Sequence, residues 1–483
     1  MARLRSSGAR LFTRDNSFGV RSDSGCLVLV SGEAVIADIR PDASLAYANL
    51  KLISNANVGM HEYPFHKTTL PNGLRVLTEH HPDVHSATIG LWVVAGSIYE
   101  SASEAGIAHL LEHMVFKGTR KRSMTQIATV MDLLGGGMNA FTEREFVCFH
   151  VKVLAEHSPR ALELLCELIS QPALDPELLA IEKSVVLEEI RAIEDAPEEM
   201  VEDLFLSTLW SKSRWGRPII GDAKIVERLS SEDLQRFMDK HYGPQNVVVV
   251  AVGDVQHDKI VALANKWLDQ LPPNTKTRAS EPREPKVSSN HVIQRDETEG
   301  AHLIIGTRAY RHDDPKRFAS WALDSIMTGG YSSRLFQEVR EKRGLCYSIG
   351  GLSACYRTAG FWAVETSVAP DSAAKTADII GRELRKVKKN NVTKTELSRA
   401  KEMARVNLLL SEESSSAQMG RIARNELYYG RQKSTAETLA EIQGVTREAI
   451  EEVAHEIFDA RWMNFAAIGP FEDGQEPGPI DVG

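Results

Sequence analysis

The hydrophobic and polar positions of the chain predict apolar strands that alternate with long amphipathic helices. Apolar runs at residues 247–252 and 301–306 are typical of buried strands, and residues 158–169 show helical periodicity. Such alternation is typical of a layered domain in which helices pack on a sheet. The paired patterns at residues 70–78 and 86–94 favour a hairpin, and therefore a largely antiparallel sheet.

An internal repeat divides the chain into two similar halves. Residues 229–254 align without a gap with residues 445–470, 216 positions later, and both read as a capped amphipathic helix followed by a buried strand. The same offset carries Gly90 onto Gly306, so the repeat spans most of each half. A chance likeness of two helix-strand units is the alternative, and the unbroken register argues against it. We therefore expect an α+β fold with two homologous repeats, each a mostly antiparallel sheet flanked by helices.

Composition narrows the class of protein. A chain of 483 residues is too long for one core, since single cores rarely exceed roughly 250 to 300 residues. The formal net charge of -9 argues against a nucleic-acid partner, because phosphate binding requires a dense basic surface. The five cysteines lack short paired spacings, which favours a reducing compartment over a disulfide framework. No apolar run approaches the ~18 residues of a membrane span, so no membrane partner is expected.

The sharpest local signal is the sequence HLLEH at residues 109–113, inside a run of helical periodicity at residues 104–116. Positions i and i+4 share one face of a helix, so His109 and His113 can reach the same metal ion. Glu112 lies close to that face and can accept a proton from a metal-bound water, the arrangement of the inverzincin motif. A surface helix that carries these groups by accident is the alternative. The apolar neighbours argue against it, because buried histidines would have no partner except a metal.

A catalytic zinc site needs a third protein ligand from elsewhere in the chain. Spacing alone leaves the choice open among Glu143, Glu145, Glu182, Glu188 and Glu189. Glu182 and Glu189 are seven residues apart in a helical run, so their side chains project from one face of the helix. A solvated acidic helix is the other interpretation of that run.

Four motifs resemble the pitrilysin or insulinase family of metallopeptidases, in its half-size branch similar to processing peptidases. HLLEHMVFKGT at 109–119 is similar to the zinc helix of that family, GGGMNAFTERE at 135–145 to its substrate-binding strand, and VVLEEI at 185–190 to the helix with the third ligand. GGYSSRLFQEVREKRGLCYSI at 329–349 is similar to the second signature, in the C-terminal half. The resemblance covers roughly residues 70–469 and implies the LuxS/MPP-like metallohydrolase fold.

The resemblance implies a metal site with one Zn²⁺ per chain. His109, His113 and Glu189 would be its ligands, and Glu112 would be the catalytic base. Glu182 would support the site from behind a ligand, which agrees with its place on the same helical face as Glu189.

The resemblance also implies how a substrate is held. A peptide would add as a further strand and be bound by backbone hydrogen bonds along Asn139, Ala140, Phe141 and Thr142. Arg340 and Tyr347 would contact it from the C-terminal half, since both can donate hydrogen bonds to a peptide carbonyl. From the residues alone, Arg340 lies on an ordinary charged helix face.

The implied function is that of a zinc metalloendopeptidase. It would hydrolyse peptides or unfolded polypeptide segments by means of a zinc-bound water that Glu112 activates. Only the N-terminal half is expected to hold the metal, because the repeat places residues 325–329, which cannot usefully bind zinc, opposite the zinc motif. The acidic stretch at residues 188–203 either favours basic peptides or is a plain solvated helix.

The two kinds of half face each other in the family, so we expect a homodimer, or a heterodimer with a related subunit, that encloses the substrate. The alternative function is a non-catalytic core or scaffold subunit of the same superfamily, although such proteins usually lose their zinc ligands. A metal-binding domain that recognises peptides without cutting them is a second alternative.

The expected domains are an N-terminal tail at 1–60, a catalytic zinc-binding domain at 61–272, a linker at 273–290 and an inactive repeat domain at 291–475. The tail is expected to be disordered or a targeting segment, because its first 21 residues hold five arginines and one acidic residue. A bacterial-type cytoplasmic location is favoured, and the mitochondrial matrix is the alternative.

Overall fold

The computed structural model describes residues 63–269, 271, 283–473 and 476–483, together with four two- or three-residue strands near the N-terminus. Those strands form two antiparallel pairs, β1 (Arg21–Ser22) with β2 (Gly25–Cys26) and β3 (Val28–Val30) with β4 (Glu33–Val35). The rest of the expected tail at 1–60, and residues 273–282 of the expected linker, lie outside the described residues. The chain divides into one unit of residues 1–62 and one of residues 63–483.

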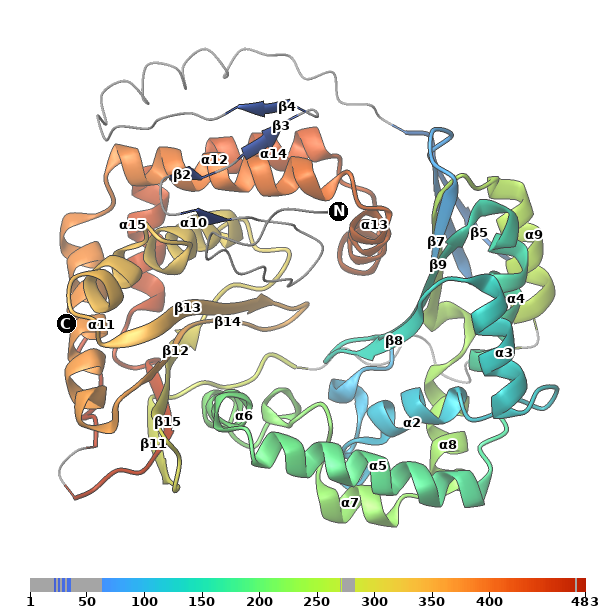
Figure 1. Cartoon of the computed structure of the whole chain (residues 1–483), viewed down its shortest axis with the longest axis horizontal. Coiled ribbons are helices and arrows are strands. Elements are labelled where there is room, and N and C mark those ends of the chain that lie inside the picture. The colour runs from blue at the N-terminus through green and yellow to red at the C-terminus, as the bar shows by residue number, and fades with distance from the viewer. Residues whose placement is uncertain are drawn as a thin grey trace, which may run out of the picture. The chain divides into compact units, whose positions relative to one another are not determined.

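The first half is built on a six-stranded sheet with the order β5-β6-β10-β7-β9-β8 (Figure 1). Only β6 and β10 are parallel, and every other neighbouring pair is antiparallel. The strands are β5 (Phe65–Thr69), β6 (Arg75–His80), β7 (Ser86–Val93), β8 (Met138–Thr142), β9 (Val147–Leu154) and β10 (Val247–Gly253). The predicted antiparallel character is therefore correct, and β8 is an edge strand.

The predicted hairpin between residues 70–78 and 86–94 is wrong. β6 pairs with β5 on one side and with β10 on the other, so β10 separates it from β7. All seven residues of β10 are buried, and a strand with no polar face takes a central place in a sheet. The burial of β10 at the centre of the sheet therefore prevents β6 and β7, which are neighbours in sequence, from pairing with each other.

The second half repeats the same topology with one strand fewer. Its sheet has the order β11-β15-β12-β14-β13, and again only one pair, β11 with β15, is parallel. The strands are β11 (Asn290–Arg295), β12 (Ala301–Arg308), β13 (Cys346–Cys355), β14 (Gly360–Val368) and β15 (Asn464–Gly469). Gly253 ends β10 and Gly469 ends β15, as the sequence repeat predicts. The predicted fold class, two α+β repeats, is confirmed.

The helices also repeat. Those of the first half are α2 (Ile107–Val115), α3 (Met124–Leu134), α4 (Ser158–Ser170), α5 (Pro176–Glu194), α6 (Pro197–Leu209), α7 (Ala223–Arg228), α8 (Ser231–His241) and α9 (His257–Leu268). Those of the second are α10 (Arg317–Thr328), α11 (Ala373–Asn390), α12 (Lys394–Ser411), α13 (Ser415–Tyr429), α14 (Thr435–Gly444) and α15 (Arg447–Ile457). Ser230 caps α8 and Thr446 caps α15 by accepting a backbone N–H, so the predicted capped helices of the repeat are correct.

The halves exchange one helix each. α6 belongs to the first half but packs on β12 and β15, whereas α13 belongs to the second half and packs on β7 and β10. Two glycines of the repeat make this possible. A Cβ atom on Gly90 would lie 2.4 Å from the sulfur of Met419, and one on Gly306 would lie 2.7 Å from the Phe205 ring. The exchanged helices therefore join both sheets in one apolar core.

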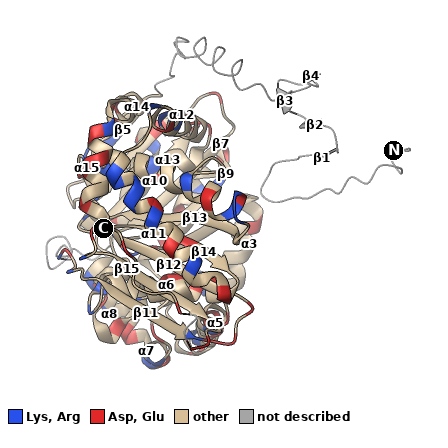
Figure 2. Cartoon of the chain, turned by 90° about the vertical axis from the view of Figure 1, so that its left-hand side faces the viewer, with Lys and Arg blue, Asp and Glu red and all other residues tan. Residues whose placement is uncertain are grey.

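Figure 2 shows Lys and Arg interspersed with Asp and Glu along the helices on that side of the described residues. Among the described residues, no helix combines the length and the apolar character needed to cross a bilayer. Cys148, Cys166, Cys346 and Cys355 are free thiols.

Candidate metal and peptide site

The helix α2 carries the predicted zinc motif on its one polar face. Its other residues are buried in the core of the first half, Ile107, Ala108, Leu110, Leu111, Met114 and Val115. The start of the helix is fixed by the carboxyl group of Glu100, whose two oxygens accept hydrogen bonds of 3.0 Å from the backbone N–H groups of Gly106 and Ala108. These bonds satisfy backbone donors that have no partner within the helix.

The structure brings His109, His113 and Glu189 together. Nε2 of His109 lies 3.9 Å, and Nε2 of His113 lies 3.7 Å, from the same carboxylate oxygen of Glu189, which α5 places opposite α2. Two donors on one tetrahedral zinc ion lie roughly 3.4 Å apart at ordinary bond lengths, so these side chains need to close by only about half an ångström. Within the described part of the chain, no other three His, Cys, Asp or Glu side chains converge in this way.

The protonation state of His109 suits a metal ligand. Burial, and then the neighbouring imidazole of His113, lower the pKa of His109 to about 4. The side chain is therefore neutral near pH 7, and the neutral imidazole is the form that binds a metal. This set of two imidazoles and one carboxylate is typical of catalytic zinc sites, which keep a fourth position open.

Glu182 lies behind the metal site, on the same face of α5 as Glu189. Its Oε2 is 3.3 Å from Nδ1 of His113, and its Oε1 is 2.8 Å from Nζ of Lys117. The Glu182 side chain is only 5% exposed, so the ammonium group of Lys117 offsets a buried negative charge. The pair fixes which ring nitrogen of His113 is turned towards Glu189.

Glu112 faces the edge strand β8. Its Oε2 accepts a hydrogen bond of 2.5 Å from the hydroxyl of Thr142, the last residue of that strand. Burial raises the pKa of Glu112, while the Thr142 hydrogen bond and the charge of His113 oppose that rise. A half-buried carboxylate with a raised pKa is well suited to accept and return a proton.

The predicted substrate strand is the free edge of the first sheet. Among the strands that the structure describes, β8 pairs with β9 on one side only, so its outer backbone groups are available to a further strand. Along it, Asn139 is exposed and Ala140 is half-buried, whereas Phe141 packs edge-on against Trp92, with ring centroids 5.7 Å apart. The strand is thus anchored by one face and open along its edge.

Arg340 and Tyr347 lie together in the second half. Arg340 is in a short helical turn (Phe336–Glu341), and its guanidinium lies 5.3 Å from the centroid of the ring of Tyr347, the second residue of β13. Tyr347 is 86% exposed. An aromatic ring this exposed is available to a ligand rather than to the core.

The other candidate ligands serve elsewhere. Glu188 pairs with Arg191 on the outer face of α5, and Glu143 lies in the turn between β8 and β9. Glu145 is buried against the second half.

Lys117 and Glu100 complete the site but were not predicted. Lys117 follows His113 by four residues, so helical spacing could have indicated that the two side chains lie near each other. For Glu100, the sequence offers only an acidic residue after an apolar run.

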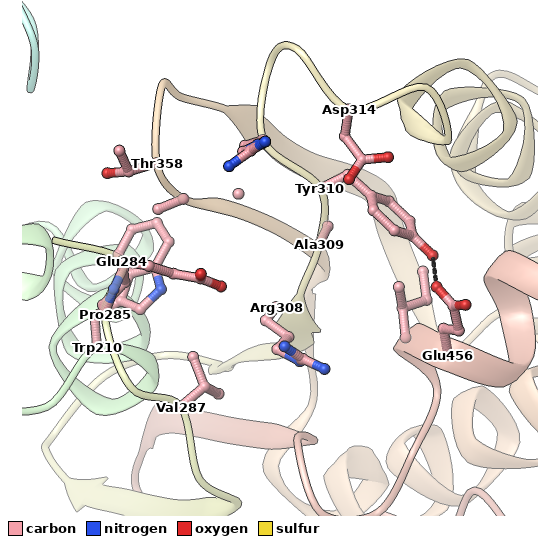
Figure 3. A pocket seen from close by; sticks show the side chains of 14 residues that line it. Trp210, Glu284, Pro285, Val287, Arg308, Ala309, Tyr310, Asp314, Thr358 and Glu456 are labelled. Carbon is pink, nitrogen blue, oxygen red and sulfur yellow. Dashed lines mark hydrogen bonds between the residues drawn. The ribbon is translucent and has the colours of Figure 1, made fainter.

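Two hollows lie outside the zinc-binding face. A cavity of about 270 Å³ is bordered by Trp210, Arg308 and Tyr310, whose hydroxyl bonds to Glu456 (Figure 3). Its lining includes no residue of the zinc motif. A wider hollow of about 900 Å³ is lined by acidic residues and by Tyr347. The second hollow therefore adjoins the predicted substrate site, and the first does not.

Comparisons with known proteins identify the family of the chain. Residues 75–223 match the family model described as insulinase (peptidase family M16), and residues 228–404 match the peptidase M16 inactive domain. An uncharacterized zinc protease of Streptomyces coelicolor is 36% identical over 85% of this chain and 90% of its own length. An uncharacterized zinc protease of Bacillus subtilis is 33% identical over 83% of this chain and 97% of its own length.

Solved structures share the fold. A protease from Helicobacter pylori superposes with a TM-score of 0.80 at 22% identity, covering 85% of this chain and all of that one. A structure titled as a peptidase M16 inactive domain from Pseudomonas fluorescens has a TM-score of 0.78 at 21% identity over 86% of this chain. By its similarity to relatives along nearly their whole length, this chain belongs to the insulinase family of peptidases, family M16, in its half-size form.

Proposed function

We propose that this protein is a zinc-dependent endopeptidase that cuts peptides or unfolded polypeptide segments. The observation that carries the proposal is the convergence of His109, His113 and Glu189 beside Glu112. These are four chemically suitable side chains on two helices, α2 and α5, next to an open strand edge. The names of the relatives as zinc proteases support the same metal and reaction class.

Zinc would be held by Nε2 of the two histidines and one carboxylate oxygen of Glu189. When bound at such a site, zinc lowers the pKa of a water to about 7 and polarises a carbonyl group. Glu112 would accept the proton of the attacking water and return it to the leaving amine. Thr142 holds the Glu112 carboxylate by the hydrogen bond of 2.5 Å, so the base is oriented before substrate arrives.

The substrate would bind as a strand along β8. Backbone hydrogen bonds to residues 139–142 tolerate many sequences, which suits an enzyme that cuts unfolded segments. Because the Thr142 hydroxyl contacts Glu112, a peptide on this edge would pass close to the base. Arg340 and Tyr347 would donate hydrogen bonds to the peptide from the second half.

The acidic hollow supports a preference for basic side chains. Its carboxylates come from both halves, Asp195 and Glu198 at the α5–α6 junction and Glu297 and Glu299 before β12, and it also contains Tyr347. A concave surface lined by one sign of charge concentrates the potential and attracts the opposite charge. Lysine or arginine near the scissile bond would occupy it.

We propose that the active form is a dimer, either of two copies or with a related subunit, which encloses the substrate between a zinc-binding half and an Arg340/Tyr347 half. The half-size chain supports this, because it contains one half of each kind. Light scattering on the active fraction tests it. Full activity in a species of monomer mass would contradict the dimer.

The decisive experiment compares cleavage of a quenched-fluorescent, arginine-containing peptide by the wild type and by Glu112→Gln. We expect loss of at least about 10³-fold in kcat, because both proton transfers depend on this carboxylate. Glu156→Gln, at an exposed position outside the site, is the matched control and should keep full activity. Zinc content measured by mass spectrometry should be one ion per chain in all three proteins.

An inactive wild type that carries its full zinc content would contradict the peptidase proposal. That result would favour the non-catalytic scaffold alternative, or a domain that binds peptides without cutting them. Peptide binding by the inactive protein would distinguish these two.

A further inference from the structure

Glu145 connects the catalytic edge strand to the second half of the molecule. Its side chain is buried, with only 5% of the residue exposed. One carboxylate oxygen accepts a hydrogen bond of 3.0 Å from the backbone N–H of Arg357, and the other accepts one of 2.6 Å from the hydroxyl of Tyr428. A buried carboxylate that bridges two segments of the other half is costly unless both bonds are kept.

The partners of Glu145 are themselves fixed. Tyr428 belongs to α13, the exchanged helix, and stacks on the ring of His312 with centroids 4.1 Å apart. Arg357 lies in the turn between β13 and β14, and its guanidinium donates to the carbonyl of Leu427. Glu145 is therefore held by a rigid surface of the second half.

The turn that carries Glu145 is short and is closed by a backbone hydrogen bond. It joins β8 to β9, whose last ladder pair is Thr142 with Val147, and Glu143 N–H donates to the Phe146 carbonyl at 2.8 Å. The turn is the counterpart, in the repeat, of the β13–β14 turn that holds Arg357. The equivalent hairpin turns of the two halves thus meet, and a shift at Glu145 reaches Thr142 within three residues.

We propose that Glu145 is a positioning residue through which the second half holds Thr142, and with it the base Glu112, in place. This inference rests on the proposed peptidase function. It gives the second half a role in catalysis beyond contact of Arg340 and Tyr347 with substrate. A misplacement of about 1 Å in a catalytic group can cost on the order of 100-fold in rate, so a partial loosening at Thr142 is expected to be measurable.

Tyr428→Phe tests the proposal, because it removes one hydroxyl and keeps the ring that stacks on His312. We expect kcat to fall about tenfold with zinc content unchanged. Tyr429→Phe is the matched control. It removes the neighbouring hydroxyl, which donates to the His312 carbonyl at 3.1 Å and does not touch the β8–β9 turn. Its kcat should remain within about twofold of the wild type.

A double mutant separates positioning from general loosening. If Tyr428 acts through Thr142, adding Tyr428→Phe to Thr142→Val lowers kcat by less than about twofold, because the linked contact is already lost. Effects that multiply in the double mutant, or an unchanged kcat in Tyr428→Phe, would overturn the proposal. Glu145→Gln, which keeps the shape and removes the charge, should resemble Tyr428→Phe.

Hydrogen exchange gives an answer that does not depend on activity. We expect faster amide exchange across residues 138–146 in Tyr428→Phe than in Tyr429→Phe. Equal protection of this segment in the two variants would overturn the proposal even if the wild type proved inactive. An inactive wild type with the expected difference in exchange would refute the peptidase function and leave the structural connection standing.

Discussion

Oε2 of Glu182 lies 3.3 Å from Nδ1 of His113, while Nε2 of the same ring faces Glu189. A carboxylate on the far nitrogen fixes the tautomer and orientation of a ligating imidazole. We therefore expect Glu182→Gln to lower the affinity for zinc by about 10- to 100-fold. Competition with a chromophoric chelator measures this change. Glu177→Gln, on the exposed first turn of the same helix, should bind zinc as the wild type does.

Lys117 should have a smaller effect of the same sign. Its ammonium lies 2.8 Å from Oε1 of Glu182, and Lys117→Met leaves that buried carboxylate without its cation. We expect Lys117→Met to lose less zinc affinity than Glu182→Gln loses, and to melt at a lower temperature than the wild type. An affinity equal to that of the wild type would mean that His113 alone orients the carboxylate.

Much of the fold could be predicted from the sequence, because the same pattern of helix and strand occurs in both halves. The helix and strand at residues 229–254 recur at 445–470, so one pattern predicted α8 with β10 and α15 with β15. The all-apolar pattern of β10 indicates a central strand, but it does not say that the neighbours of that strand are β6 and β7, because local pattern does not choose pairing partners. The helix exchange was also hidden, because the amphipathic face of α6 does not say which sheet it covers.

The site divides in the same way. His109 and His113 follow from helical spacing, and the resemblance to the family supplied Glu189. The bonds of Thr142, Lys117 and Glu145 join segments far apart in the chain, and periodicity within one segment carries no information about such contacts.

Stability should depend on pH through Glu100. Burial raises the pKa of this carboxyl from 4.5 to about 8. Between those values the native protein keeps a proton that the unfolded chain has lost, so the contribution to stability is complete below about pH 4.5 and is lost as the pH rises towards 8. The melting temperature of the wild type should therefore fall across this window.

Glu100→Gln removes that titration and one hydrogen-bond acceptor. Even when protonated, the carboxyl can accept the N–H groups of Gly106 and Ala108 with both oxygens, whereas the amide nitrogen of glutamine cannot accept, so we expect a loss of about 1 to 3 kcal/mol at pH 5. The difference in unfolding free energy from the wild type should shrink as the pH approaches 8. A constant difference across this range would show that the carboxyl does not change its ionisation there.

The acidic hollow predicts a measurable specificity. Glu198→Gln with Glu299→Gln removes two of its negative charges without changing side-chain size. We expect kcat/KM for peptides with arginine or lysine near the scissile bond to fall by about tenfold, with neutral peptides nearly unaffected, and the effect to weaken at high salt. Parallel loss for both peptide classes would indicate a structural defect instead.

The exchange of α6 and α13 makes the two halves one cooperative unit. Phe205 of α6 is fully buried and lies against Phe361 of the second sheet, with ring centroids 6.0 Å apart. Phe205→Ala should cost about 3 to 5 kcal/mol, the usual loss for a buried phenylalanine. Although Phe205 precedes the linker, tryptophans of both halves, such as Trp92 and Trp362, should report the same lowered denaturation midpoint. Two separate transitions in the variant, one for each half, would contradict this coupling.

The exchange of helices also predicts how the separate halves behave. Residues 63–271 expressed alone should aggregate, because β7 and β10 lose the cover of α13. Co-expression with residues 283–483 should restore a soluble pair.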